Sequence, residues 1–133
     1  MLHHLKLGQR GEAIAQAYVR QFCSLRHLNW KSGKREIDII AERNNVIYFI
    51  EVKTRSSSRY GWPEEAVDYR KQQHIQQAAA NYLLQYALYP AAIRFDIIAI
   101  TFKDRIKERG VDNECSEYNE HHEYELMHFK DVF

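Results

Sequence analysis

The chain has 133 residues, a length that corresponds to a single domain, over residues 1–133, with one hydrophobic core. Hydrophobic residues make up 45% of it and charged residues 28%, a balance that excludes collagen-like, coiled-coil and wholly disordered proteins. The longest apolar run, Val46–Ile50, is too short for a membrane span, and the N-terminal residues lack the pattern of a signal peptide. Cys23 and Cys115 cannot form a disulfide framework, so the expected location is the reducing cytoplasm.

The net charge of +1 hides an uneven distribution of charged residues. Residues 1–103 carry 15 Lys and Arg against 9 Asp and Glu, whereas residues 104–133 carry 4 against 9. This asymmetry favours a body that faces nucleic acid followed by an acidic segment, although a mixed solvated surface explains it equally well. The polar stretch at about 103–122 lacks a hydrophobic period, so we predict a long acidic loop there.

Hydrophobic spacing predicts the elements of the first half of the chain. Apolar residues at helical spacing predict a helix over about Gly8–Cys23, and a weaker pattern predicts a strand over Ser24–Trp30. Runs of β-branched and aromatic residues predict two further strands over Ile37–Ala41 and Val46–Thr54. Asn44-Asn45 between them indicates a tight turn, because Asn tolerates the left-handed backbone region.

In the second half of the chain, a helical pattern begins at Glu64 or Glu65 and closes at Tyr89-Pro90. An apolar run predicts a buried strand over Ile93–Phe102, and Tyr124–Phe129 is predicted as a last short strand. The resulting order is one helix, three strands, one helix and two strands. That order predicts an α/β domain with a mixed sheet.

The sharpest chemical signal is formed by Asp38 on one strand and by Glu51 and Lys53 on the next. Because side chains alternate along a strand, Glu51 and Lys53 project from the same face. A two-residue turn at Asn44-Asn45 gives cross-strand partners whose numbers sum to 89, which places Asp38 opposite Glu51 with Cβ atoms about 5 Å apart. A three-residue turn would break this pairing, and the apolar pattern does not settle the register.

Two carboxylates that face each other in a sheet repel, and a bound divalent cation removes that cost. Oxygen ligands alone suit Mg²⁺ or Mn²⁺, and Lys53 beside them can orient an attacking water or neutralise a phosphate in the transition state. In the competing interpretation, Asp38 is a strand-end residue bonded to backbone, and Glu51 and Lys53 form an ordinary exposed ion pair. The apolar residues around these charges favour the functional interpretation, which is phosphodiester hydrolysis.

Four groups of residues in this order resemble the YraN-like family of bacterial proteins: Gly11-Glu12, Glu36–Ala41, Glu51–Arg55 and Arg94–Asp96. The resemblance extends over about Leu7–Ile100. That family is similar to archaeal Holliday-junction resolvases of the PD-(D/E)xK nuclease superfamily, so the resemblance implies a restriction-endonuclease-like fold. The proline of the superfamily's name is absent, since Ile37 precedes Asp38, but the metal-binding chemistry does not need it.

The resemblance implies an active site made of Glu12, Asp38, Glu51 and Lys53. Asp38 and Glu51 would ligate Mg²⁺ or Mn²⁺, the carbonyl of Val52 would add a ligand, and Lys53 would act on the attacking water. Glu12 would be an outer or additional metal ligand. Its position on the first helix would, without the resemblance, indicate a solvated side chain.

Four basic residues near this site are predicted to contact nucleic-acid phosphates: Arg10, Arg35, Arg55 and Lys71. Taken singly, each is better explained as a solvated surface charge. As a group around a metal site, they favour a polyanionic substrate.

The expected function is therefore that of a metal-dependent endonuclease acting on DNA, including branched or otherwise structured DNA, with no organic cofactor and no membrane partner. Resolvases of this kind act as homodimers on the two symmetric cuts of a four-way junction, although the sequence itself proves no dimer. Two alternatives stay open. One is a nucleic-acid-binding protein that cleaves nothing, and the other is an adaptor whose acidic segment, residues 104–133, binds a protein.

Overall fold

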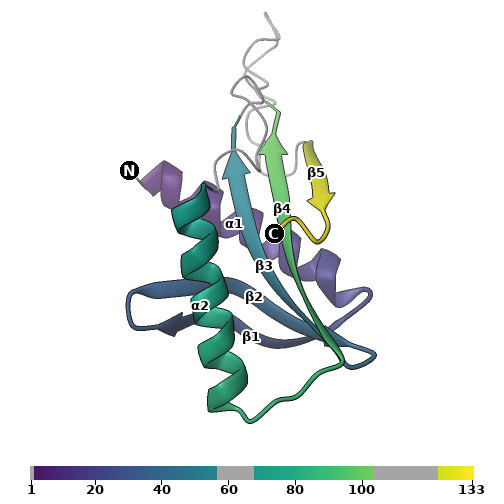
Figure 1. Ribbon diagram of the computed structural model, residues 1–133. Helices are drawn as coiled ribbons and strands as arrows, with labels where there is room; N and C mark the ends of the chain where they lie inside the picture. Colours follow the sequence, from purple (N-terminus) through teal and green to yellow (C-terminus); the bar gives the residue numbers. More distant parts are fainter. Residues whose placement is uncertain (1, 57–67, 104–122) are drawn as a thin grey trace, which may run out of the picture.

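The structure is a computed structural model that describes residues 2–56, 68–103 and 123–133 (Figure 1). The elements are α1 (Leu2–Arg20), β1 (Ser24–Ser32), β2 (Arg35–Arg43), β3 (Val46–Arg55), α2 (Tyr69–Gln85), β4 (Ala92–Phe102) and β5 (Tyr124–Phe129). This confirms the predicted α/β class and element order, which agree with a restriction-endonuclease-like fold. The acidic loop predicted at about 103–122 lies outside the described residues, apart from Lys103.

The strands form one five-stranded mixed sheet in the order β1-β2-β3-β4-β5. β1, β2 and β3 pair antiparallel, β3 and β4 pair parallel, and β5 pairs antiparallel with β4. Because parallel neighbours need a crossover connection, α2 lies between β3 and β4 in the chain. Figure 1 shows α2 on one face of the sheet and α1 across the other.

The β2–β3 hairpin has the predicted register. Its pairs run from Ile39–Ile50 to Arg43–Val46, and the residue numbers of each pair sum to 89. Asn44 and Asn45 form the two-residue turn with φ angles of 51° and 63°. Two successive left-handed residues match the twist of a tight hairpin, and Asn accepts this conformation at low cost.

The side chains of β3 alternate between two cores. Phe49 packs in a cluster with Ile75 and Tyr82 of α2, whereas Ile50 packs in a second cluster with Ala15 and Val19 of α1. All six side chains are at most 2% exposed. Odd-numbered residues of β3 therefore face α2 and even-numbered residues face α1, and this division decides which groups can meet further along the strand.

Both predicted bounds of the first helix are wrong. The helix begins at Leu2 rather than Gly8, and it ends at Arg20 rather than Cys23. The amides of Gln21 and Phe22 bond to carbonyls three residues earlier, which tightens the last turn and ends the helix. Among the described residues, no helix combines the length and the apolar character that crossing a bilayer requires.

The end of α2 also differs from the prediction, since the helix stops at Gln85 rather than at Tyr89-Pro90. Ala87 has a left-handed backbone with φ of 51°, and the amide of Leu88 bonds to the carbonyl of Leu83 at 2.9 Å. This is the Schellman arrangement, which closes a helix without proline.

The beginning of α2 is set by its N-cap. Asp68 has an extended backbone, and its side chain accepts a hydrogen bond from the amide of Lys71 at 2.9 Å. The helix therefore begins at Tyr69. The starts predicted at Glu64 or Glu65 lie outside the described residues.

Gly11 allows α1 to approach β3 closely. A Cβ atom at this position would overlap the side chain of Thr54 on β3. We therefore expect Gly11→Ala to lower the free energy of unfolding by about 1–3 kcal/mol, because the overlap forces the helix away from the strand.

Gly8→Ala is the matched control, since no atom lies within 4 Å of a Cβ at Gly8. That substitution should raise the free energy of unfolding by about 0.5–1 kcal/mol through helix propensity. Urea unfolding at pH 7 measures both variants. Equal effects of the two substitutions would contradict a close helix–strand approach at Gly11.

Candidate active site

The candidate site forms where the pairing of β2 with β3 ends and its pairing with β1 is interrupted. The β2–β3 pairs stop at Ile39–Ile50, one position before Asp38 and Glu51 would pair. The β1–β2 pairs skip the position of Asp38, where Asn29 on β1 has a left-handed backbone with φ of 49°. The predicted register is therefore confirmed as far as Ile39–Ile50, and Asp38 and Glu51 lie just beyond this last ladder pair.

Where the β2–β3 ladder ends, the side chain of Asp38 makes the next hydrogen bond between the two strands. Its Oδ2 atom accepts a hydrogen bond from the backbone amide of Val52 at 2.8 Å. The competing interpretation, in which Asp38 bonds to backbone, is thus correct for this contact. It is wrong for Glu51, which is only 5% exposed and is no surface residue.

The carboxyl groups of Asp38 and Glu51 are hydrogen-bonded to each other. Burial, followed by the negative charge of Asp38, raises the pKa of Glu51 to about 8. Burial also raises the pKa of Asp38, while the Val52 amide acts in the opposite direction. The Glu51 carboxyl therefore keeps its proton at neutral pH, in contact with the carboxyl group of Asp38.

Two lysines lie beside this pair. Lys53 follows Glu51 on the α2 face of β3, and Lys71 lies in the first turn of α2. Both ammonium groups lower the pKa of Glu51, and Lys71 also lowers that of Asp38. The chain thus brings two cations within electrostatic range of the two carboxyl groups.

Glu12 approaches the site from α1 but is held by a different partner. Its Oε1 atom accepts a hydrogen bond from Nδ2 of Asn29 at 3.2 Å. Burial raises the pKa of Glu12, the Asn29 contact lowers it, and the negative charges of Asp38 and Glu36 raise it. Glu12 is therefore within electrostatic range of Asp38, and Asn29, which sequence reasoning missed, connects α1 to the open edge of β2.

The other predicted nucleic-acid contacts come from three different elements. Arg10 on α1 places its guanidinium 4.7 Å from the ring centre of Phe102. Arg35 at the start of β2 has a buried Nε atom with no hydrogen-bond partner among the described residues. Arg55 ends β3 on the face of Glu51 and Lys53, whereas Arg10 lies across the sheet on α1.

The donor set of the site consists of oxygen atoms. Such donors suit Mg²⁺ or Mn²⁺, and a divalent cation between Asp38 and Glu51 would take the place of their shared proton. In the described parts of the chain, no three His, Cys, Asp or Glu residues lie close enough together to hold a metal ion. The pair therefore offers two carboxylates, and water or substrate would have to complete a metal's coordination.

The raised pKa of Glu51 gives a testable pH dependence of stability. The folded state holds a proton that the unfolded state releases above the ordinary pKa of 4.5, so stability falls as pH rises from about 4.5 to about 8. Glu51→Gln removes this loss, because a neutral amide keeps no charge in the core. In EDTA we expect this variant to be more stable than wild type by about 2 kcal/mol at pH 9, with little difference at pH 4.5.

Urea unfolding at these two pH values measures the effect. Glu125→Gln is the matched control, since Glu125 is an exposed residue of β5. A Glu51→Gln variant that is less stable than wild type at pH 9 would contradict the buried, protonated Glu51.

Comparison with known proteins gives one family. The profile of the uncharacterised protein family UPF0102 matches residues 11–100. A UPF0102 protein of Phocaeicola vulgatus is 42% identical over 101 residues, 75% of this chain and 83% of the relative. One of Geobacter metallireducens is 39% identical over 108 residues, 80% and 88% of the two chains. One of Chlorobium phaeobacteroides is 40% identical over 129 residues, 96% and 92%.

Proposed function

We propose that this chain, which belongs to the uncharacterised protein family UPF0102, is an endonuclease that hydrolyses DNA phosphodiester bonds with Mg²⁺ or Mn²⁺. UPF0102 and the YraN-like family are the same family, so this membership confirms the predicted resemblance. The observation that carries the proposal is the buried Asp38–Glu51 carboxyl pair, which shares one proton beside Lys53 and Lys71. Two buried carboxyl groups in contact are costly to fold, because ionising both would place like charges side by side, and such pairs are typical of functional sites.

The metal would be held by the carboxyl groups of Asp38 and Glu51, with the carbonyl of Val52 as a further ligand. Glu12 would contribute from outside, through water, because Asn29 holds its carboxylate. When bound, the metal would supply Lewis-acid stabilisation of the phosphate and lower the pKa of the attacking water. The Val52 amide fixes the orientation of Asp38 before any metal arrives.

The lysines would act on the phosphodiester. Lys53 lies on the same face as Glu51, so its ammonium group can orient the attacking water and balance the charge that develops on the phosphate. Lys71 enters from the start of α2 and would hold the phosphate in place. Arg55, on the face of Lys53, would bind the adjoining backbone phosphates.

DNA as the substrate, and branched DNA in particular, follows from the resemblance to Holliday-junction resolvases. The excess of basic residues in positions 1–103 supports a polyanionic substrate. A homodimer would supply the two active sites that two symmetric cuts require.

A cleavage assay on a four-way junction, a flap, single-stranded DNA and plain duplex tests this proposal. Wild type should cut at least one substrate with Mg²⁺ or Mn²⁺ and none in EDTA. Glu51→Ala should be inactive, and the exposed control Glu125→Ala should cut like wild type. The DNA substrate that is cut fastest would identify the substrate class.

Two results would overturn the proposal. If wild type and Glu51→Ala bind DNA equally and neither cuts, the chain is a nucleic-acid-binding protein without nuclease activity. If neither binds DNA and a protein partner is retained only while the acidic C-terminal segment is present, the chain is an adaptor.

A further inference from the structure

A polar cavity that includes neither Asp38 nor Glu51 lies beside the first half of β3. Its volume is about 200 Å³, and its walls include Arg43, Arg94, Lys130, Tyr48 and His128. Tyr48 faces α1, whereas Glu51 faces α2. The cavity and the candidate active site are therefore on opposite faces of the sheet.

Arg94 is held in place from two directions. Its Nε and one terminal nitrogen donate to the two oxygens of Asp96, at 3.2 and 2.8 Å. Its guanidinium also lies over the ring of Tyr48, 4.6 Å from the centroid. Asp96 uses two of the five N–H groups of Arg94, so the others are available to a ligand in an orientation that is already fixed.

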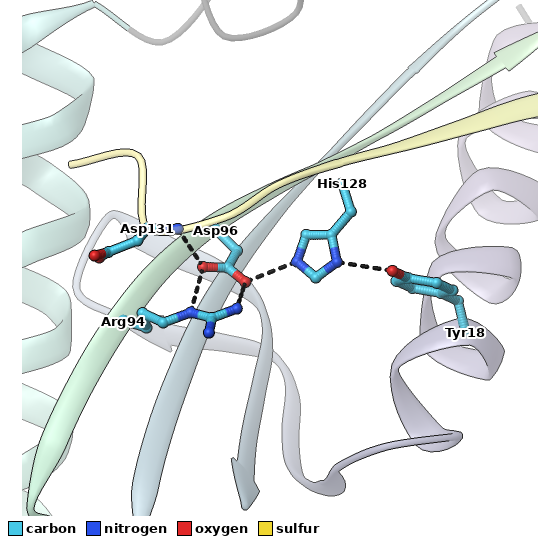
Figure 2. A network of polar contacts seen from close by, with 5 residues as sticks. All are labelled: Tyr18, Arg94, Asp96, His128 and Asp131. Atoms are coloured by element: carbon cyan, nitrogen blue, oxygen red, sulfur yellow. Dashed lines mark hydrogen bonds and ion pairs between the residues drawn. The ribbon is translucent and has the colours of Figure 1, made fainter.

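His128 is fixed by the same carboxylate. Its Nε2 atom donates to the carboxylate of Asp96 at 2.7 Å, and its Nδ1 atom forms a hydrogen bond with the hydroxyl of Tyr18 at 2.8 Å. Figure 2 shows this chain of contacts from Arg94 through Asp96 and His128 to Tyr18 on α1. The backbone amide of Asp131 also donates to Asp96, at 2.8 Å.

The charges that reach the cavity are mainly positive. Arg43 and Lys130 are exposed, and with Arg94 they give the walls three cations and no carboxylate. Asp96 is 1% exposed and fully used by its four donors. The other nearby acid is Asp131, which is exposed and raises the pKa of Arg94 only as the last of several contributors.

We propose that this cavity binds a phosphate group. Its three cations include two arginines, whose planar N–H groups match phosphate oxygens. Its volume of about 200 Å³ is below the 300–1,000 Å³ or so of pockets that enclose drug-sized ligands, so it takes one phosphate rather than a whole nucleotide. The phosphate comes from a free nucleotide or from a nucleic-acid backbone. This inference does not rest on the proposed nuclease activity.

The test follows the Nε–H signal of Arg94 by NMR in EDTA at constant salt concentration. Wild type is titrated with inorganic phosphate, deoxyadenosine monophosphate and a short single-stranded oligonucleotide. Arg43→Gln/Lys130→Gln should weaken binding of the best probe about tenfold or more. Lys31→Gln/Lys34→Gln is the matched control, because it removes the same charge at and beside the end of β1, outside the cavity walls, and should change binding less than twofold.

The arms of the titration distinguish the source of the phosphate. Tightest binding of the mononucleotide identifies a free nucleotide, and tightest binding of the oligonucleotide identifies a nucleic-acid backbone. The proposal is overturned if no probe shifts the Arg94 signal, or if both double variants lose affinity equally. The wild-type titration alone decides the question if a variant does not fold. Because EDTA suppresses metal-dependent cleavage, failure of the nuclease proposal would leave this result unchanged.

Discussion

Asp96→Asn is expected to lower the free energy of unfolding by about 3 kcal/mol at pH 7. The side chain of Asp96 accepts two hydrogen bonds from Arg94, one from His128 and one from the Asp131 amide. Asparagine offers one oxygen and turns an NH₂ group toward these donors, so at least one buried donor loses its partner. Removing one member of a buried ion pair costs about 3–5 kcal/mol, and the 29% exposure of Arg94 places the loss near the lower end.

Glu42→Gln is the matched control for this prediction. Glu42 pairs with Arg26 at 2.8 Å, but the two side chains are 38% and 26% exposed. Such an exposed ion pair contributes at most about 1 kcal/mol to the free energy of unfolding. Urea unfolding measures both variants, and equal losses would mean that burial does not strengthen the Asp96 contacts.

Asp96→Asn should also change how the free energy of unfolding depends on pH in the acid range. Burial alone would raise the pKa of Asp96, but the donors from His128, Arg94 and Asp131 outweigh it and lower the pKa from 3.8 to about 2. A lowered pKa adds stability in full above about pH 4, and this stability is lost as pH falls toward about 2. The deficit of Asp96→Asn should therefore shrink over that interval.

The local parts of the fold can be predicted because they depend on neighbouring residues. The turn at Asn44-Asn45 requires two left-handed residues, and these set the register of β2 and β3. That register brings Asp38 to Glu51, and alternation along β3 brings Lys53 to the same face. Spacing alone therefore located the centre of the candidate site.

The parts that spacing could not locate depend on contacts between distant segments. Asn29 carries no apolar or charged pattern, yet its left-handed backbone opens the sheet beside Asp38, and its amide holds Glu12. His128 bonds to Tyr18, 110 residues earlier in the chain, and no periodicity connects the two. Arg94 and Asp96 are two residues apart on one strand, whereas the other donors to Asp96 come from the C-terminal residues.

Lys53→Met is expected to slow DNA cleavage about 10²–10³-fold under single-turnover conditions, if the proposed activity is correct. Methionine keeps most of the length and apolar volume of lysine but supplies no charge to the phosphate in the transition state. A fixed charge in a partly buried site contributes more there than it would in water. Lys53 is half-buried, and its charge lies close enough to the carboxyl pair to lower the pKa of Glu51, so it is such a charge in a partly buried site.

Metal binding separates this role from a structural one. Asp38 and Glu51 stay in place in Lys53→Met, so Mn²⁺ affinity measured by calorimetry should be unchanged or slightly higher, because a repelling cation has been removed. Lys31→Met, an exposed change on β1, controls for the loss of one charge and should cleave at the wild-type rate. Equal rates in the two variants would remove Lys53 from the chemistry. Loss of Mn²⁺ binding in Lys53→Met would show instead that Lys53 holds the carboxyl pair in place, because only a disturbed pair loses the metal together with the activity.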